Sequence, residues 1–176
     1  MPRKRAGLIG CGSVGISFLI TLVALATLLL DLENKKGGVS ELYNWVTAGS
    51  FSLNMSILID PLSVFMLLIV TGVGFVIHVY SIGYMENDPE FSRFFSYLNF
   101  FIFSMSLLVL AADFFFLIVG WALVGLASYL LIGFWKEKTS AVLAARKAFV
   151  MNVIGDVGMV IAAFIIFDHL GTLNFL

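Results

Sequence analysis

The amino-acid sequence predicts an all-α integral membrane protein, with five transmembrane helices in a bundle and a short outer β segment. Three observations carry this prediction: 61% of the 176 residues are hydrophobic, only 12% are charged, and the apolar residues run in long stretches. A soluble domain is about half apolar and about a quarter charged, and a domain of this length could not bury such an excess. The net charge of −1 offers no basic surface for nucleic acid, and the single Cys11 excludes an internal disulfide or a cysteine-rich metal site.

Five segments are long enough to cross a bilayer, since a spanning helix needs about 20 predominantly apolar residues. We expect the spans at about residues 7–30, 62–84, 94–112, 114–135 and 147–167. Basic residues precede the first segment, as in a signal peptide, but its apolar core is too long for one, so we interpret it as a retained span. The third and fourth spans are separated only around Asp113, which predicts a tight helical hairpin.

Basic residues predict the orientation in the membrane. With the N-terminus inside, the inner segments carry eight Lys and Arg residues and the outer loops carry two. The eight are Arg3, Lys4, Arg5, Arg93, Lys136, Lys138, Arg146 and Lys147, and the two are Lys35 and Lys36. Because Lys and Arg gather on the cytoplasmic side, we expect the N-terminus and the loop at 136–140 on that side, and the loop at 31–60 on the other.

The long loop at 31–60 changes character along its length. Its first part is polar and rich in glycine, whereas apolar and polar residues mostly alternate through 51–60. A period of two predicts a short strand. An open strand edge is not tolerated in lipid, so we expect this strand to lie at the water face and to pair with another strand.

Small residues predict where helices approach one another closely. Four glycines, Gly7, Gly10, Gly12 and Gly15, cluster near the start of the first span. In the fourth span Gly125 lies at helical spacing from Trp121, Ser128 and Tyr129, which is typical of close packing around a glycine. We interpret Trp121 and Gly125 as structural neighbours of a site rather than as its chemical groups.

Asp156 is the first candidate functional residue, because a carboxylate at the bilayer centre costs about 2.5–3.5 kcal/mol on insertion scales. It lies roughly mid-way through the fifth span, and Asn152 lies four residues earlier on the same helical face. A proton or ion relay facing the bundle interior is one interpretation, and a structural carboxylate bonded to a neighbouring helix is the alternative.

His78 and Lys147 are the other candidates for proton relay. Thr71, Gly74, His78 and Ser81 share one side of the second span, and histidine changes charge near neutral pH. A neutral histidine bonded between helices fits the same pattern. Lys147 lies nine residues before Asp156 and half a turn away, so the two cannot pair directly. An interfacial anchor whose side chain reaches the inner surface is the preferred interpretation of Lys147, and a charge relay is the alternative.

Ordered motifs connect the sequence to a known family. They are Ile59-Asp60-Pro61-Leu62-Ser63, Thr71 to His78, Phe91 to Tyr97, Gly120-Trp121, Ser128 to Trp135, Lys147 to Val150, Gly155-Asp156-Val157 and Leu170 to Phe175. These motifs resemble the L subunit (subunit 5) of respiratory complex I, the proton-translocating NADH:quinone oxidoreductase. The same membrane module resembles the large subunit of multisubunit sodium/proton antiporters.

The resemblance implies that residues 1–176 are part of an antiporter-like proton-translocation domain in the bacterial plasma membrane, with the N-terminus cytoplasmic. It implies a multi-pass subunit that works with other membrane subunits, protons and lipid. The sequence has no nucleotide, flavin or redox-metal motif. No cofactor is therefore expected on this chain, and NADH, FMN, iron–sulfur clusters and quinone would belong to partner subunits.

The sequence departs from the family pattern in three ways. The family is much longer, so we expect a fragment holding its early spans. The family has a glutamate after Gly-Trp where this chain has Ala122, and commonly an arginine three residues before the Gly-Asp aspartate, where this chain has Val153. These departures leave open a sodium/proton antiporter subunit, or a structural fragment without transport, as alternatives to a proton-translocating subunit of an NADH:quinone oxidoreductase.

Overall fold

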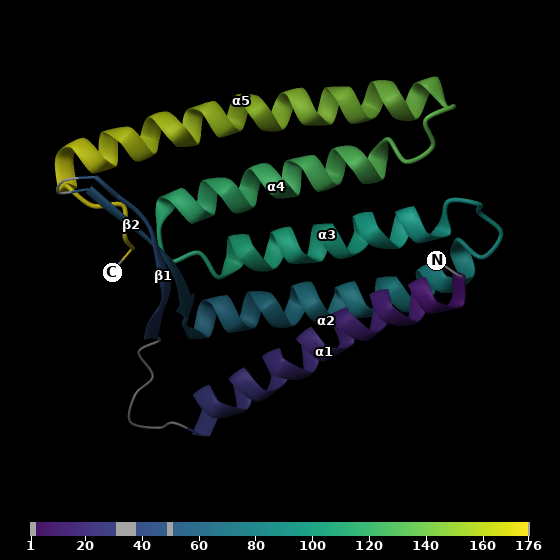
Figure 1. Ribbon diagram of the computed structural model, residues 1–176, viewed down its shortest axis with the longest axis horizontal. Helices are drawn as coiled ribbons and strands as arrows, with labels where there is room; N and C mark the ends of the chain where they lie inside the picture. Colours follow the sequence, from purple (N-terminus) through teal and green to yellow (C-terminus); the bar gives the residue numbers. More distant parts are fainter. Residues whose placement is uncertain (1–2, 31–37, 49–50, 176) are drawn as a thin grey trace.

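The computed structural model describes residues 3–30, 38–48 and 51–175 (Figure 1). Within them lie five helices, α1 (Arg3–Leu30), α2 (Pro61–Tyr84), α3 (Phe91–Val109), α4 (Phe114–Ile132) and α5 (Thr139–Leu170), and two strands, β1 (Gly38–Ala48) and β2 (Phe51–Ile59). All five helices are long and apolar enough to cross a membrane. The chain is therefore a multi-pass helical membrane protein with a small β element, as predicted.

The helix bounds differ from the expected spans mainly in α5, which begins at Thr139 rather than near residue 147. Apolarity marks the part of a helix that crosses the lipid, but charged residues such as Arg146 and Lys147 do not stop a helix and simply extend it into the interface. At the other end Gly171 stops α5, because its φ of 69° is a left-handed conformation that favours glycine.

Two aspartates fix where α2 and α4 begin. The Asp60 carboxylate accepts a hydrogen bond from the Ser63 amide (2.7 Å), and the Ser63 hydroxyl accepts one from the Asp60 amide (2.9 Å), which forms a capping box. Asp113 is only 2% exposed, and its carboxylate accepts from the Phe116 amide at 2.8 Å. Burial raises the pKa of Asp113, while the Phe116 and Phe115 amides lower it. Only four residues separate the end of α3 from the start of α4, so the predicted hairpin is present.

The helices α2, α3, α4 and α5 lie side by side in chain order, and α1 packs against α2 and α3 (Figure 1). Gly10 allows the closest approach of α1, because a Cβ there would lie 2.8 Å from the Phe95 ring and 2.9 Å from the Asn99 amide. Gly7 and Gly15 also face aromatic rings, whereas Gly12 has no heavy atom within 4 Å of such a Cβ. The predicted glycine contact surface is therefore confirmed at three of its four positions.

Strands β1 and β2 form the outer β segment. They pair antiparallel from Gly38↔Ile59 to Ala48↔Phe51, with irregularities between Glu41 and Tyr43 and between Asn44 and Val46. The alternation predicted β2 correctly, and β1 is the partner strand that it required. Residues 31–37, most of the polar first part of the loop, lie outside the described residues. Gly38, its last residue, begins β1.

The hairpin is tied to the end of the bundle where α3 turns into α4. The Leu58 amide donates to the Leu110 carbonyl at 2.9 Å. The C-terminal segment joins the same turn, because the Phe114 amide donates to the Leu173 carbonyl (3.0 Å) and the Phe175 amide donates to the Ala112 carbonyl (3.1 Å). We call this the hairpin end of the bundle. The opposite end holds the start of α1, the turn after α2 and the α4–α5 loop, and we call it the basic end (Figure 1).

This separation of the two ends agrees with the expected relative placement of the loops, and the cytoplasmic position of the basic end stays a prediction. In a Cys11→Ala background, we expect a membrane-impermeant maleimide to label Lys138→Cys in inverted vesicles but not in intact spheroplasts. Glu41→Cys on β1 is the matched control and should show the reverse pattern, since both positions are exposed and lie at opposite ends. Labelling of Lys138→Cys in spheroplasts would reverse the orientation.

Candidate functional site

Asp156 and Asn152 form a hydrogen-bonded pair in the middle of α5. The Asn152 side-chain amide donates to Asp156 Oδ1 at 3.3 Å, and both side chains are partly buried. In the part of the chain that the structure describes, this is the only hydrogen bond of the Asp156 carboxylate. One carboxylate oxygen is held by an amide, and the other remains available to take up or release a proton.

The Asn152 side chain packs directly against the backbone of α4 at Gly125. A Cβ at Gly125 would collide with the Asn152 amide nitrogen, so the asparagine rests on bare helix backbone. One turn nearer the basic end, the Tyr129 ring packs on the Phe149 ring with 5.5 Å between centroids. The close packing expected around Gly125 is thus present, and its contact is the residue that bonds to Asp156.

His78 lies inside a separate interface, formed by α1, α2 and α3. It is fully buried, its Nδ1 donates to the Gly74 carbonyl at 2.7 Å, and its ring makes an edge-to-face contact with the Phe95 ring, with 6.0 Å between the ring centroids. The hydroxyls of Thr71 and Ser81 donate to carbonyls of their own helix. We call the helix face formed by Thr71, Gly74, His78 and Ser81 the His78 stripe. Among the described residues His78 Nε2 has no hydrogen-bond partner, so it is the free polar atom of the His78 stripe.

The structure does not bring the three candidate relay residues together. His78 lies on α2 and Asp156 on α5, with α3 and α4 between them (Figure 1). Lys147 is exposed on α5 toward the basic end and forms no ion pair within the described ranges. The arrangement therefore offers two separate buried or partly buried polar positions rather than one catalytic cluster.

A clamp at the basic end was not predicted from the sequence. Arg93 at the start of α3 pairs with Glu90 (3.0 Å), donates to the Phe134 carbonyl (3.3 Å) and stacks over the Phe134 ring at 5.0 Å. The Trp135 indole N–H donates to Asp88 at 3.2 Å. These contacts tie the turn between α2 and α3 to the end of α4. An arginine and an adjacent Phe-Trp pair, each at a span end, were the signal available in the sequence.

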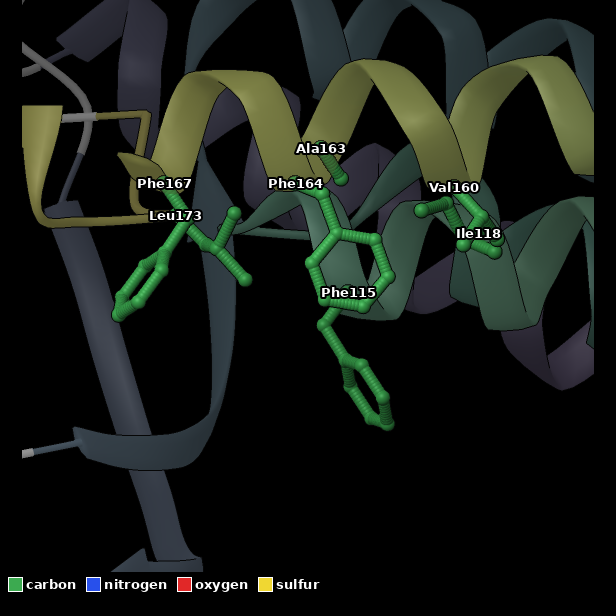
Figure 2. A pocket seen from close by; sticks show the side chains of 7 residues that line it. All are labelled: Phe115, Ile118, Val160, Ala163, Phe164, Phe167 and Leu173. Atoms are coloured by element: carbon green, nitrogen blue, oxygen red, sulfur yellow. The ribbon is translucent and has the colours of Figure 1, made fainter. Parts of the chain in front are cut away.

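A cavity of about 460 Å³ lies between α4 and α5 near the hairpin end. Figure 2 shows the seven side chains that line it: Phe115, Ile118, Val160, Ala163, Phe164, Phe167 and Leu173. All are apolar, so the cavity offers no group that could move a proton or hold an ion. Across residues 3–30, 38–48 and 51–175, no three His, Cys, Asp or Glu side chains are grouped as metal ligands would be.

Comparison with known proteins places these features in a family. Residues 45–95 match the family described as NADH-Ubiquinone oxidoreductase (complex I), chain 5 N-terminus. Residues 111–176 match the family described as NADH:quinone oxidoreductase/Mrp antiporter, TM. The fold and the two matches define a membrane subunit of the antiporter-like class.

Curated relatives narrow this class. The chain is 45% identical over 168 residues to NADH-quinone oxidoreductase subunit L of Mycobacterium tuberculosis and 42% identical over 170 residues to that of Escherichia coli. It is 46% identical over 174 residues to subunit L of Pseudomonas aeruginosa. These alignments cover 96–98% of this chain and 26–28% of the relatives. The chain therefore belongs to the subunit L family of NADH-quinone oxidoreductases and spans about a quarter of the length of these relatives.

Solved structures agree on the fold. A chain of the Mrp complex from Dietzia sp. DQ12-45-1b superimposes with a TM-score of 0.72 at 22% identity, covering 99% of this chain and 20% of that one. A chain of the membrane-bound sulfane sulfur reductase, an archaeal respiratory membrane complex, gives a TM-score of 0.75 at 19% identity, covering 95% of this chain and 33% of that one. At these identities the likeness concerns the fold alone.

Proposed function

We propose that this chain is part of a proton-translocating membrane subunit of a complex I-like NADH:quinone oxidoreductase. The single observation that carries the proposal is the Asn152–Asp156 pair, a titratable group with an oriented hydrogen-bond donor in the middle of a membrane-spanning helix. A carboxylate at that depth is costly and is retained by default for function. Membership of the subunit L family supports the same proposal.

Each candidate residue has a distinct role in this proposal. Asp156 takes up and releases the transported proton, with its free carboxylate oxygen as the acceptor. His78 is a second exchange position, because Nε2 can accept a proton while Nδ1 stays bonded to the Gly74 carbonyl. Lys147 contributes positive charge on the side from which protons reach Asp156. Protons pass between these separate positions through water or through other parts of the assembly.

The redox chemistry belongs to other subunits in this proposal. NADH, FMN, iron–sulfur clusters and quinone are held by partners, and this chain contributes to coupling within the membrane. The subunit lies in the bacterial plasma membrane, with the basic end and the N-terminus on the cytoplasmic side. Its direct partners are other membrane subunits, protons and lipid.

Two alternatives make different predictions. A sodium/proton antiporter subunit is favoured by the match of residues 111–176, whose family description also includes Mrp antiporters. A structural fragment without transport is favoured by Ala122 and Val153, the positions where the family resemblance implies a glutamate and an arginine. Both residues are exposed, on α4 and α5 respectively, and neither can exchange a proton.

Deletion of the gene for this chain distinguishes the proposed proton-translocating subunit of an NADH:quinone oxidoreductase from a sodium/proton antiporter subunit. In inverted membrane vesicles of the source organism, we expect NADH-driven acidification to be lost, while NADH oxidation with a soluble electron acceptor persists. Intact NADH-driven acidification together with lost sodium/proton exchange would instead identify an antiporter subunit. The variant Ala122→Glu tests the structural-fragment alternative. Proton transport that appears only in this variant would mean that the native chain is structural.

A further inference from the structure

A second cavity lies at the basic end, where α3, α4 and α5 meet. Its volume is about 290 Å³, and its walls include Tyr97 of α3, Tyr129 and Gly133 from α4 and its C-cap, Lys136 of the α4–α5 loop, and Val142 of α5. Unlike the apolar cavity at the hairpin end, it has a charged group and two phenols in its wall. It lies outside the Asn152–Asp156 pair, with the packed rings of Tyr129 and Phe149 between the two.

Lys136 is the charged group of this cavity that remains available for a ligand. It forms no ion pair within the described part of the chain. The neighbouring cations are already engaged, since Lys138 lies 4.6 Å from the Trp135 ring and Arg93 is bound to Glu90. Lys136 therefore lines the cavity with a positive charge that no carboxylate of residues 3–30, 38–48 and 51–175 neutralises.

The two tyrosines supply hydrogen-bond donors whose rings are held in place. The Tyr97 ring packs on Phe134 at 6.4 Å and the Tyr129 ring packs on Phe149 at 5.5 Å. Neither phenolic hydroxyl makes a hydrogen bond within residues 3–30, 38–48 and 51–175. The lysine and the two tyrosines in the wall of this small cavity supply one ammonium and two O–H donors, groups that suit the oxygens of a phosphate group.

The position of the cavity in the bundle favours a lipid headgroup as the molecule that carries this phosphate group. It lies where α4 ends at Ile132 and α5 begins at Thr139, the depth at which a spanning helix meets the headgroup layer. The basic end has eight Lys and Arg residues against four acidic ones, Glu86, Asp88, Glu90 and Glu137. Basic pockets between transmembrane helices on the cytoplasmic side bind the headgroups of anionic lipids.

We propose that this cavity binds the phosphodiester of an anionic phospholipid, with Lys136 as its charge partner and the hydroxyls of Tyr97 and Tyr129 as donors. The lipid would join the ends of α3, α4 and α5 at the basic end of the bundle. The site is independent of proton transport, because none of its groups belongs to the Asn152–Asp156 pair or to the His78 stripe.

Lipid retention by the purified full-length protein tests this site. We expect native mass spectrometry to detect retained phosphatidylglycerol in preference to phosphatidylcholine. Removing one charge near the membrane surface costs about 1 kcal/mol, so Lys136→Gln should weaken phosphatidylglycerol binding about fivefold. Arg146→Gln is the matched control, since it removes an exposed charge at the same end outside the cavity wall, and it should leave the preference intact.

Further variants make each outcome decisive. Val142→Phe, which fills the cavity without changing charge, and the double variant Tyr97→Phe/Tyr129→Phe should each reduce phosphatidylglycerol retention. Equal losses in Lys136→Gln and Arg146→Gln would reduce the site to general surface attraction and overturn the proposal. Displacement of the lipid by millimolar inorganic phosphate would assign the site to free phosphate, and unchanged retention in Val142→Phe would place the lipid elsewhere.

Discussion

With Asp156 replaced by asparagine, we expect proton transport by the assembled complex to fall by about 10²-fold, the lower range of what a positioned acid–base group contributes to a proton transfer. Asparagine keeps the size of the side chain and can still bond to Asn152, but it cannot take up a proton. Assembly should therefore survive. The measurement is NADH-driven acidification of inverted vesicles, normalised to complex quantified on a native gel.

Asp168→Asn is the matched control, because it makes the same change on the same helix at a side chain that is 86% exposed. It should leave both transport and assembly unchanged. Full transport with normal assembly in Asp156→Asn would remove the relay role and leave a structural carboxylate. If Asp156→Asn failed to assemble while Asp168→Asn assembled normally, Asp156 would likewise be a structural carboxylate.

The sequence predicted the five spans and the Asn152–Asp156 face because both follow from regular spacing. Long apolar stretches mark membrane crossings, and a separation of four residues places two side chains on one helical face. The hydrogen bond between Asn152 and Asp156 realises that geometry within one helix. The strand pattern of residues 51–60 worked for the same reason, since alternation depends only on neighbouring residues.

Features that depend on contacts between different helices or strands could not be predicted from residue spacing along the sequence. Strand β1 is defined by its pairing with β2 and carries two irregularities, so its own pattern is interrupted. The cavity around Lys136 needs three helices to meet, and the separation of His78 from Asp156 depends on the order in which the helices pack. Spacing along one helix contains none of this information.

Gly125→Ala is expected to have the second largest effect, because any Cβ at this position occupies the space of the Asn152 amide. Overpacking of a tight contact costs about 1–3 kcal/mol. We expect the free energy of unfolding in mixed micelles to fall by about that amount, with a parallel loss of proton transport as Asn152 is pushed away from Asp156. Gly12→Ala is the control, since a Cβ there meets no heavy atom within 4 Å, and it should be neutral or slightly stabilising.

The double variant Gly125→Ala/Asn152→Ala separates packing from hydrogen bonding. Removing the Asn152 amide relieves the collision, so the free energy of unfolding should return most of the way to that of the native chain. The donor to Asp156 is nevertheless lost, so proton transport should stay low, and the infrared carbonyl stretch of protonated Asp156 should move to higher wavenumber. Recovery of transport together with stability would show that Gly125 and Asn152 serve packing alone. A Gly125→Ala chain as stable as the native one would contradict the contact itself.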